Sequence, residues 1–207
     1  MIISDEHRLL FVHVQKTGGV TLTTMLKEQL REVRVVGRRH APLERILRNE
    51  PDLVDYWTFG FVRNPWDRMV SWWAMITNWR DWSRRKGTSM DDRWNPMWRG
   101  VSQYTSFEQF VTEGPDSFEV LRRNQIDFLR CDLPELGIRR TADFIGRTEN
   151  LQADTAVVFD RFGLRLDRTA HHNRSKRTEY REYYTRATRD RVAEVFARDV
   201  AEFGYEF

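Results

Sequence analysis

The chain has 207 residues, of which 40% are hydrophobic and 31% are charged, and this balance excludes a disordered or low-complexity protein. Its 34 basic and 31 acidic residues leave a net charge of only +3, although arginines can still concentrate in one cleft. Cys131 is the only cysteine, which excludes an internal disulfide and a thiolate metal site. The first hydrophobic run, residues 9–14, is too short to cross a bilayer, so we expect a cytoplasmic protein without a membrane span.

Strands and helices alternate through the first part of the chain. A short apolar run with β-branched residues predicts a buried strand over residues 9–14, and leucines and methionine at helical spacing predict a helix from about Thr21. The pattern then predicts a strand at residues 33–36 and a helix at residues 43–47. A second buried strand is predicted at residues 57–62, and a helix from Pro65 onward.

The second part begins with a segment of weak periodicity. We expect a tryptophan-rich irregular insert at about residues 79–104. Beyond it, the pattern predicts helices at residues 107–111, 121–129, 151–162 and 188–203, and a strand at residues 143–146. The alternation predicts one α/β domain over residues 1–207, with helices on both sides of a central parallel sheet in a three-layer fold.

The turn after the first predicted strand has the composition of an anion-binding loop. Gly18 and Gly19 let backbone N–H groups turn toward an anion, and the following helix N-terminus adds positive potential. Lys16 supplies a mobile charge, and Thr17 or Thr21 supplies a hydroxyl. Because the lysine precedes the glycines, this is not a P-loop of the nucleoside triphosphatase kind. A tight turn with a surface lysine explains the motif alone equally well.

A second candidate phosphate site follows the strand at residues 57–62. Arg63 lies just past its carboxyl end, where ligands of open α/β sheets bind, and Ser71 lies two helical turns further on. A guanidinium and a hydroxyl could share one phosphate there. The alternative is that Arg63 caps the sheet and pairs with an acid such as Asp67.

Taken together and in this order, these segments resemble the sulfotransferases that use 3′-phosphoadenosine 5′-phosphosulfate (PAPS). Residues 13–21 are similar to the loop that binds the 5′-phosphosulfate, and residues 61–71 to the strand and helix that bind the 3′-phosphate. Residues 145–151 resemble a segment of the nucleotide pocket. The C-terminal segments 171–175 and 203–207 resemble the carbohydrate-type, family 2 branch, which has bacterial and Golgi-like members.

The resemblance implies a P-loop-like fold and transfer of a sulfuryl group from PAPS to an acceptor hydroxyl, leaving adenosine 3′,5′-bisphosphate, without a metal. It implies that Lys16 is catalytic at the bridging or leaving oxygen. The other residues expected to bind the cofactor are Thr17, Gly18, Gly19, Val20, Thr21, Arg63, Ser71, Thr148, Arg174 and Ser175.

Two positions depart from the family pattern. Val20 stands where the family usually carries Ser or Thr, so that Thr21 is expected to supply the missing hydroxyl. Gln15 replaces the usual proline before the lysine, which removes no ligand.

His40 is the candidate catalytic base. It lies in a basic loop after the strand predicted at residues 33–36, where the resemblance places a catalytic His or Glu, and imidazole has a suitable pKa for proton transfer. A surface histidine without a role is the alternative. His13, by contrast, falls inside the first predicted strand, which favours a structural role.

The tryptophans cluster in and just before the predicted insert. Trp72 and Trp73 lie inside a predicted helix, so at least one of them is expected in the core. Trp79, Trp82 and Trp94 are expected, with His40, to bind the acceptor, and plain packing of a satellite cluster is the alternative.

Two other functions compete with sulfuryl transfer. An ATP-dependent small-molecule kinase is disfavoured because no Walker-type carboxylate accompanies the lysine. A non-catalytic nucleotide- or RNA-binding protein is disfavoured because the aromatics lack the sheet spacing of RNA-binding modules, so we expect no nucleic-acid partner. We expect a carbohydrate or glycoconjugate acceptor, with a lipid or a secondary metabolite as alternatives. The sequence leaves the oligomeric state open.

Overall fold

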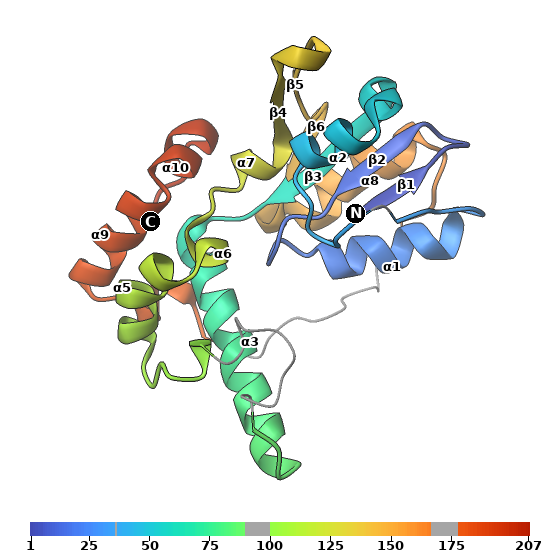
Figure 1. Cartoon of the computed structure of the whole chain (residues 1–207). Helices are drawn as coiled ribbons and strands as arrows, with labels where there is room; N and C mark the ends of the chain where they lie inside the picture. The colour runs from blue at the N-terminus through green and yellow to red at the C-terminus, as the bar shows by residue number, and fades with distance from the viewer. Residues whose placement is uncertain (36, 90–99, 167–177) are drawn as a thin grey trace. The chain divides into compact units, whose positions relative to one another are not determined.

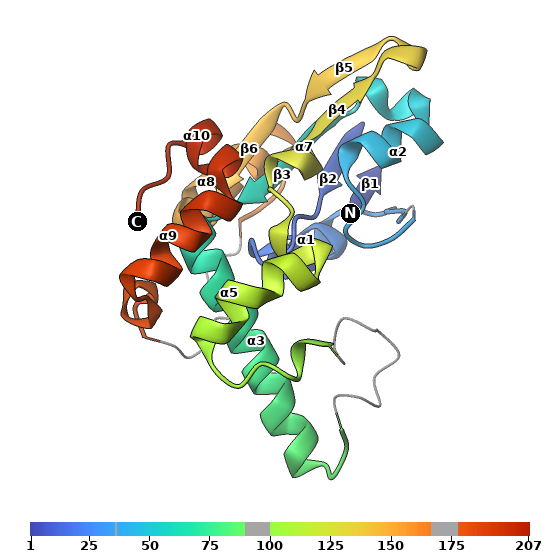
Figure 2. The ribbon, with the colours of Figure 1, turned by 60° about the vertical axis from the view of Figure 1, so that its left-hand side comes forward.

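The computed structural model describes residues 1–35, 37–89, 100–166 and 178–207. The chain divides into two compact units, which Figures 1 and 2 show in two orientations. The first unit comprises Met1–Arg63 and Gln125–Arg174, and the second comprises Asn64–Asn124 and Ser175–Phe207. A single domain over the whole chain stays a prediction.

A four-stranded sheet forms the centre of the first unit. Its strands are β1 (Ile2–Ser4), β2 (Leu9–Val12), β3 (Trp57–Val62) and β6 (Phe144–Arg147), in the order β1-β2-β3-β6. β2, β3 and β6 are parallel, and β1 is an antiparallel edge strand. The loops that follow the three parallel strands therefore leave the sheet at one edge, which is where open α/β sheets bind ligands.

One face of this sheet is covered by α1 (Gly19–Gln29) and α8 (Leu151–Arg161). Alternate strand residues point to this face, because side chains in a strand alternate between the two sides of a sheet. The resulting core is fully apolar, and each buried Phe or Leu side chain contributes about 1.5–3 kcal/mol. Its central members are Ile2, Leu9, Phe11, Phe59 and Phe61 from the sheet, and Leu22, Leu26, Val158 and Phe159 from the helices.

The opposite face carries α2 (Leu43–Asn49) and α7 (Ile126–Leu129). Gly60 points to this face, and a Cβ added there would lie 2.4 Å from the Leu129 side chain. A hairpin of β4 (Arg130–Leu133) and β5 (Ile138–Thr141) follows α7. Short 3-10 turns complete the unit at Pro51–Asp55, Pro134–Leu136 and Thr148–Asn150.

The described part of the second unit is helical. It contains α3 (Pro65–Arg85), α5 (Phe107–Ser117), α6 (Glu119–Arg122), α9 (Arg186–Val195) and α10 (Ala197–Phe203), with a 3-10 turn at Tyr180–Tyr183. Asn64 caps α3, because its side-chain oxygen accepts from the backbone N–H of Trp66 and of Asp67. Trp66 Nε1 donates to the carbonyl of Arg189 at 2.9 Å, which joins α3 to α9.

Most predicted elements are confirmed, which establishes an α/β protein with a mostly parallel central sheet flanked by helices. The strand at residues 57–62 has the predicted bounds, and those at 9–14 and 143–146 differ by one or two residues at their ends. The helices predicted at residues 43–47, 107–111 and 151–162 and from Pro65 also form.

Four predictions were wrong. In residues 33–35 no strand forms, because only Arg34 pairs with the sheet, through an isolated bridge to Ile3 of the edge strand β1. The irregular insert does not begin at Trp79, since α3 continues to Arg85. The helices predicted at residues 121–129 and 188–203 are each divided in two. The first is divided at Arg123–Gln125, where Arg123 is extended, and the second at Phe196, whose φ of −110° and ψ of 30° depart from helical values.

Candidate functional site

The loop between β2 and α1 has an unusual backbone. Lys16 has a φ of 69° and Gly18 has a φ of 79°, so two left-handed residues flank Thr17. A left-handed conformation costs a residue with a Cβ about 1 kcal/mol, and such strain in a loop at a sheet edge is typical of binding sites. Left-handed residues in such alternation form an anion-binding concavity of backbone N–H groups.

The loop is held from inside by Thr17. Its side chain is buried, and its hydroxyl donates to the carbonyl of Val14 at 3.0 Å. At the N-cap of α1, Gly18 has no side chain that could accept from the first N–H groups of the helix. The caps Asn64 of α3 and Thr185 of α9 do accept such bonds. The start of α1 therefore lacks the side-chain cap that the starts of α3 and α9 have.

Gly19 is required by the His13 ring. A Cβ at position 19 would lie 2.2 Å from His13 Cδ2, closer than any van der Waals contact. His13 follows β2, is 3% exposed and stacks against Phe11. Burial, and secondarily the neighbouring His40, lowers the pKa of His13 to about 2. His13 is therefore neutral at physiological pH, and its ring sets the close approach of α1 to the loop.

His40 lies directly against His13. The centroids of the two rings are 4.5 Å apart, and the rings meet edge to face. His40 Nδ1 lies 2.9 Å from the backbone oxygen of His13. A carbonyl oxygen only accepts hydrogen bonds, so Nδ1 must carry the hydrogen. In the neutral ring the lone pair is then on Nε2, which is the arrangement that a general base needs.

Arg63 connects the end of β3 to the same loop. Its Nη1 donates to the carbonyl of Lys16 at 3.2 Å. Its backbone is paired with the side chain of Gln125, which accepts from the Arg63 N–H at 2.9 Å and donates to the Arg63 carbonyl at 2.8 Å. The structure therefore brings Lys16 and Arg63 together, two residues that are 47 positions apart in the chain.

The remaining predicted residues of the first unit lie around these loops. Thr148 follows β6, and its hydroxyl donates to the carbonyl of Val62 at 3.0 Å. Thr21 is buried on α1, whereas Val20 is 37% exposed. Gln125 was missed in the sequence because a glutamine in a short helical segment carries no signal of its pairing with a distant strand end.

The other predicted site residues belong to the second unit or lie outside the described residues. Ser71 is 8% exposed on α3. Trp79 and Trp82 lie on the last turns of α3 with their rings edge to face at 5.6 Å, and Trp82 is 41% exposed. Trp72 is buried, which confirms that at least one of the Trp72 and Trp73 pair belongs to the core. Trp94, Arg174 and Ser175 lie outside the described residues.

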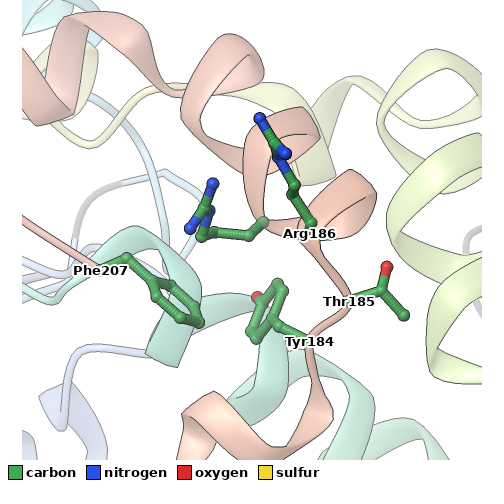
Figure 3. A pocket seen from close by; sticks show the side chains of 5 residues that line it. Tyr184, Thr185, Arg186 and Phe207 are labelled. Carbon is green, nitrogen blue, oxygen red and sulfur yellow. The ribbon is translucent and has the colours of Figure 1, made fainter.

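The second unit has a surface cavity of about 430 Å³ that contains none of the predicted site residues. Figure 3 shows the rings of Tyr184 and Phe207 at this cavity. The centroids of the two rings are 5.4 Å apart. Its other lining residues are Thr185, Arg186 and Arg189. Arg189 lies 2.7 Å from the carboxylate of Asp190, so part of the positive charge there is balanced by an acid.

The loop after β2, with its left-handed lysine, and the arginine after β3 lie together at one edge of a mostly parallel sheet. A family model described as "Sulfotransferase family" matches residues 1–206. The chain belongs to this family, in its family 2 branch, and is therefore a transferase of sulfuryl groups. A search of curated proteins finds no match.

The described residues contain neither a candidate membrane span nor a candidate metal cluster. In residues 1–35, 37–89, 100–166 and 178–207, no helix has both the length and the apolar composition that crossing a bilayer requires. In the same ranges, no three or more His, Cys, Asp or Glu side chains are grouped so that they could hold a metal ion.

Proposed function

We propose that the protein transfers the sulfuryl group of PAPS to an acceptor hydroxyl, and that the loop after β2 binds the phosphosulfate in a P-loop-like manner. The observation that carries the proposal is the pair of left-handed residues, Lys16 and Gly18, at the start of α1. Members of the sulfotransferase family normally use PAPS as the donor. Backbone N–H groups of residues 17–21 then hold the 5′-phosphate, and the Lys16 ammonium stabilises charge on the leaving oxygen.

The proposed place of the 3′-phosphate is beside Arg63. A guanidinium that reaches the carbonyl of Lys16 lies beside the loop that holds the 5′ end, and a planar fork of donors suits a phosphate dianion. Thr148, at the end of the adjacent strand β6, is proposed to lie near the adenine. Ser71, Arg174 and Ser175 remain predicted partners of the nucleotide.

The proposed base is His40. Its Nδ1 hydrogen bond to His13 selects the tautomer that has the lone pair on Nε2, and the rigid backbone after β2 fixes the ring. His13 cannot serve as the base in its place because its pKa, about 2, makes it too weak to hold a proton. The acceptor is proposed to be a carbohydrate or glycoconjugate hydroxyl, and the exposed Trp82 and the neighbouring Trp79 are proposed contacts for its rings.

The donor half of the proposal is tested by thermal denaturation with adenosine 3′,5′-bisphosphate, ATP with Mg²⁺, or an RNA oligonucleotide. A ligand that binds only the folded protein raises the melting temperature, by an amount that grows with the logarithm of its concentration above Kd. We expect stabilisation by the bisphosphate and none by the RNA. Stabilisation by ATP with Mg²⁺ and none by the bisphosphate would show that PAPS is not the donor.

A further inference from the structure

The Gln125 side chain continues the sheet where β3 stops. The last backbone pair between β3 and β6 is Val62 with Arg147, and Arg63 lies one residue beyond it. At this position the amide of Gln125 accepts from the Arg63 N–H and donates to the Arg63 carbonyl, at 2.9 and 2.8 Å. A side chain thus supplies both hydrogen bonds that a neighbouring strand would otherwise have supplied.

This pairing determines the direction in which the Arg63 side chain leaves the backbone. Gln125 is 0% exposed, so its amide is held in a single orientation by its surroundings. Two hydrogen bonds to the peptide units on either side of the Arg63 Cα fix the local backbone, and with it the Cα–Cβ bond of Arg63. The Arg63 guanidinium then reaches the carbonyl of Lys16. A long, flexible arginine side chain that is restrained in this way loses less conformational entropy when it binds a ligand.

We propose that Gln125 is a positioning residue that gives the protein its selectivity for a 3′-phosphorylated adenine nucleotide, by presenting Arg63 to that phosphate. The inference rests on the proposed function, since it assigns the 3′-phosphate to Arg63. Gln125 itself does not touch the nucleotide. Its contribution is therefore specific to ligands that carry the 3′-phosphate, and a nucleotide without it gains little from the pairing.

The chain contains a matched control for this pairing. Gln29, at the end of α1, forms the same two-bond contact with the backbone of Arg165, with distances of 2.7 and 2.6 Å. It lies at the opposite end of α1 from the loop at Lys16. Gln29→Met therefore removes a pairing of the same kind without affecting the phosphate site.

The test is isothermal titration of the full chain with adenosine 3′,5′-bisphosphate and with AMP, which lacks the 3′-phosphate. For Gln125→Met we expect the affinity for the bisphosphate to fall about tenfold, the size expected when a charge-assisted hydrogen bond is lost, and the affinity for AMP to change much less. Gln125→Glu retains the acceptor and the shape but loses the donor, so it tests the same point should the methionine variant fold poorly. Gln29→Met is expected to bind both nucleotides like the wild type.

An unchanged ratio of the two affinities in the Gln125 variants would overturn the inference. If the ratio is unchanged because both affinities fall equally, the role of Gln125 is purely structural. In an Arg63→Ala background, Gln125→Met is expected to have no further effect on that ratio. A wild-type protein that binds no bisphosphate would instead contradict the proposed function itself.

Discussion

His40 Nδ1 lies 2.9 Å from the backbone oxygen of His13, and this contact joins the candidate base to the chain segment that leads from β2 into the loop at Lys16. The imidazole of His13 lies 4.5 Å from the His40 ring, measured between centroids, and occupies the space that a side chain at position 19 would need. His13 therefore contacts the candidate base through its backbone and its ring, and its ring limits the residue at the start of α1.

His40→Ala is expected to lower kcat for sulfuryl transfer by about 10²–10⁴-fold, the usual contribution of a positioned general base. Binding of adenosine 3′,5′-bisphosphate should be retained, because the proposed role of His40 concerns the acceptor proton. Steady-state kinetics and titration of the bisphosphate measure the two effects. His7→Ala, at the turn after β1, is the control and should keep its activity. Full activity of His40→Ala would show that the base lies elsewhere.

Lys16→Ala is expected to reduce kcat about 10²–10³-fold, because it removes a cation from the place where negative charge develops. Lys27→Ala, at the last turn of α1, should have little effect. Lys16→Gly separates the effect of losing the side chain from the effect of the backbone conformation, since glycine adopts the left-handed conformation without cost. We expect this variant to be as inactive as Lys16→Ala and more stable to denaturant, and equal stability of the two variants would contradict the assigned backbone strain.

Gly19→Ala is expected to destabilise the protein by about 1–3 kcal/mol, the typical cost of overpacking, because the added methyl group overlaps the His13 ring. Removal of that ring should relieve the clash. The double variant His13→Ala, Gly19→Ala is therefore expected to lose less stability than the sum of the two single variants. Denaturant titrations of the four proteins measure the coupling, and strictly additive losses would show that the two residues do not compete for space.

Acid should destabilise the protein through His13. The pKa of this ring is lowered from 6.5 in the unfolded chain to about 2 in the fold, chiefly by burial and then by His40, the Met1 amine and Arg39. Below the unfolded value, the unfolded chain takes up a proton that the folded chain does not. The stability is thus fully present above pH 6.5 and falls by about 1.4 kcal/mol per pH unit as the pH drops below it.

This acid sensitivity is measured as the change in denaturation midpoint between pH 7 and a value near pH 5, a window in which few carboxylates titrate. His13→Asn should show a much smaller change than the wild type. His7→Asn, whose ring is half-buried at the surface, should retain the wild-type change. A His13→Asn protein with undiminished acid sensitivity would mean that another group is responsible.

Local patterns predicted the elements that carry the site. The strand ending at Val62 and the helix starting at Pro65 follow from an apolar run and a proline in the first turn. The edge strand β1 and the hairpin of β4 and β5 were missed, because their short segments are specified by pairing with distant residues. For the same reason, the isolated bridge at Arg34 was taken for a strand.

In the candidate site too, some features could be predicted from local sequence patterns and others could not. Lys16 and Arg63 could be selected from the sequence because their residue types and positions after strands indicate phosphate chemistry. His40 was selected by its place in the family pattern, and the strand predicted before it does not form in residues 33–35. The left-handed backbone of Lys16 could not be predicted from the sequence, since nothing in the residue type favours it. The pairing of Gln125 with Arg63 joins positions 62 residues apart, and only the folded chain brings them together.

Transfer of label from ³⁵S-PAPS tests the central claim most directly. The wild type and Lys16→Ala are incubated with the labelled donor and with carbohydrate, lipid and small phenolic or alcoholic acceptors in turn. We expect the wild type to form a labelled product with at least one class, most readily with a carbohydrate, and Lys16→Ala to form almost none. Absence of any labelled product with the wild type, together with transfer of the γ-phosphate from ³²P-ATP to the same acceptors, would contradict the claim.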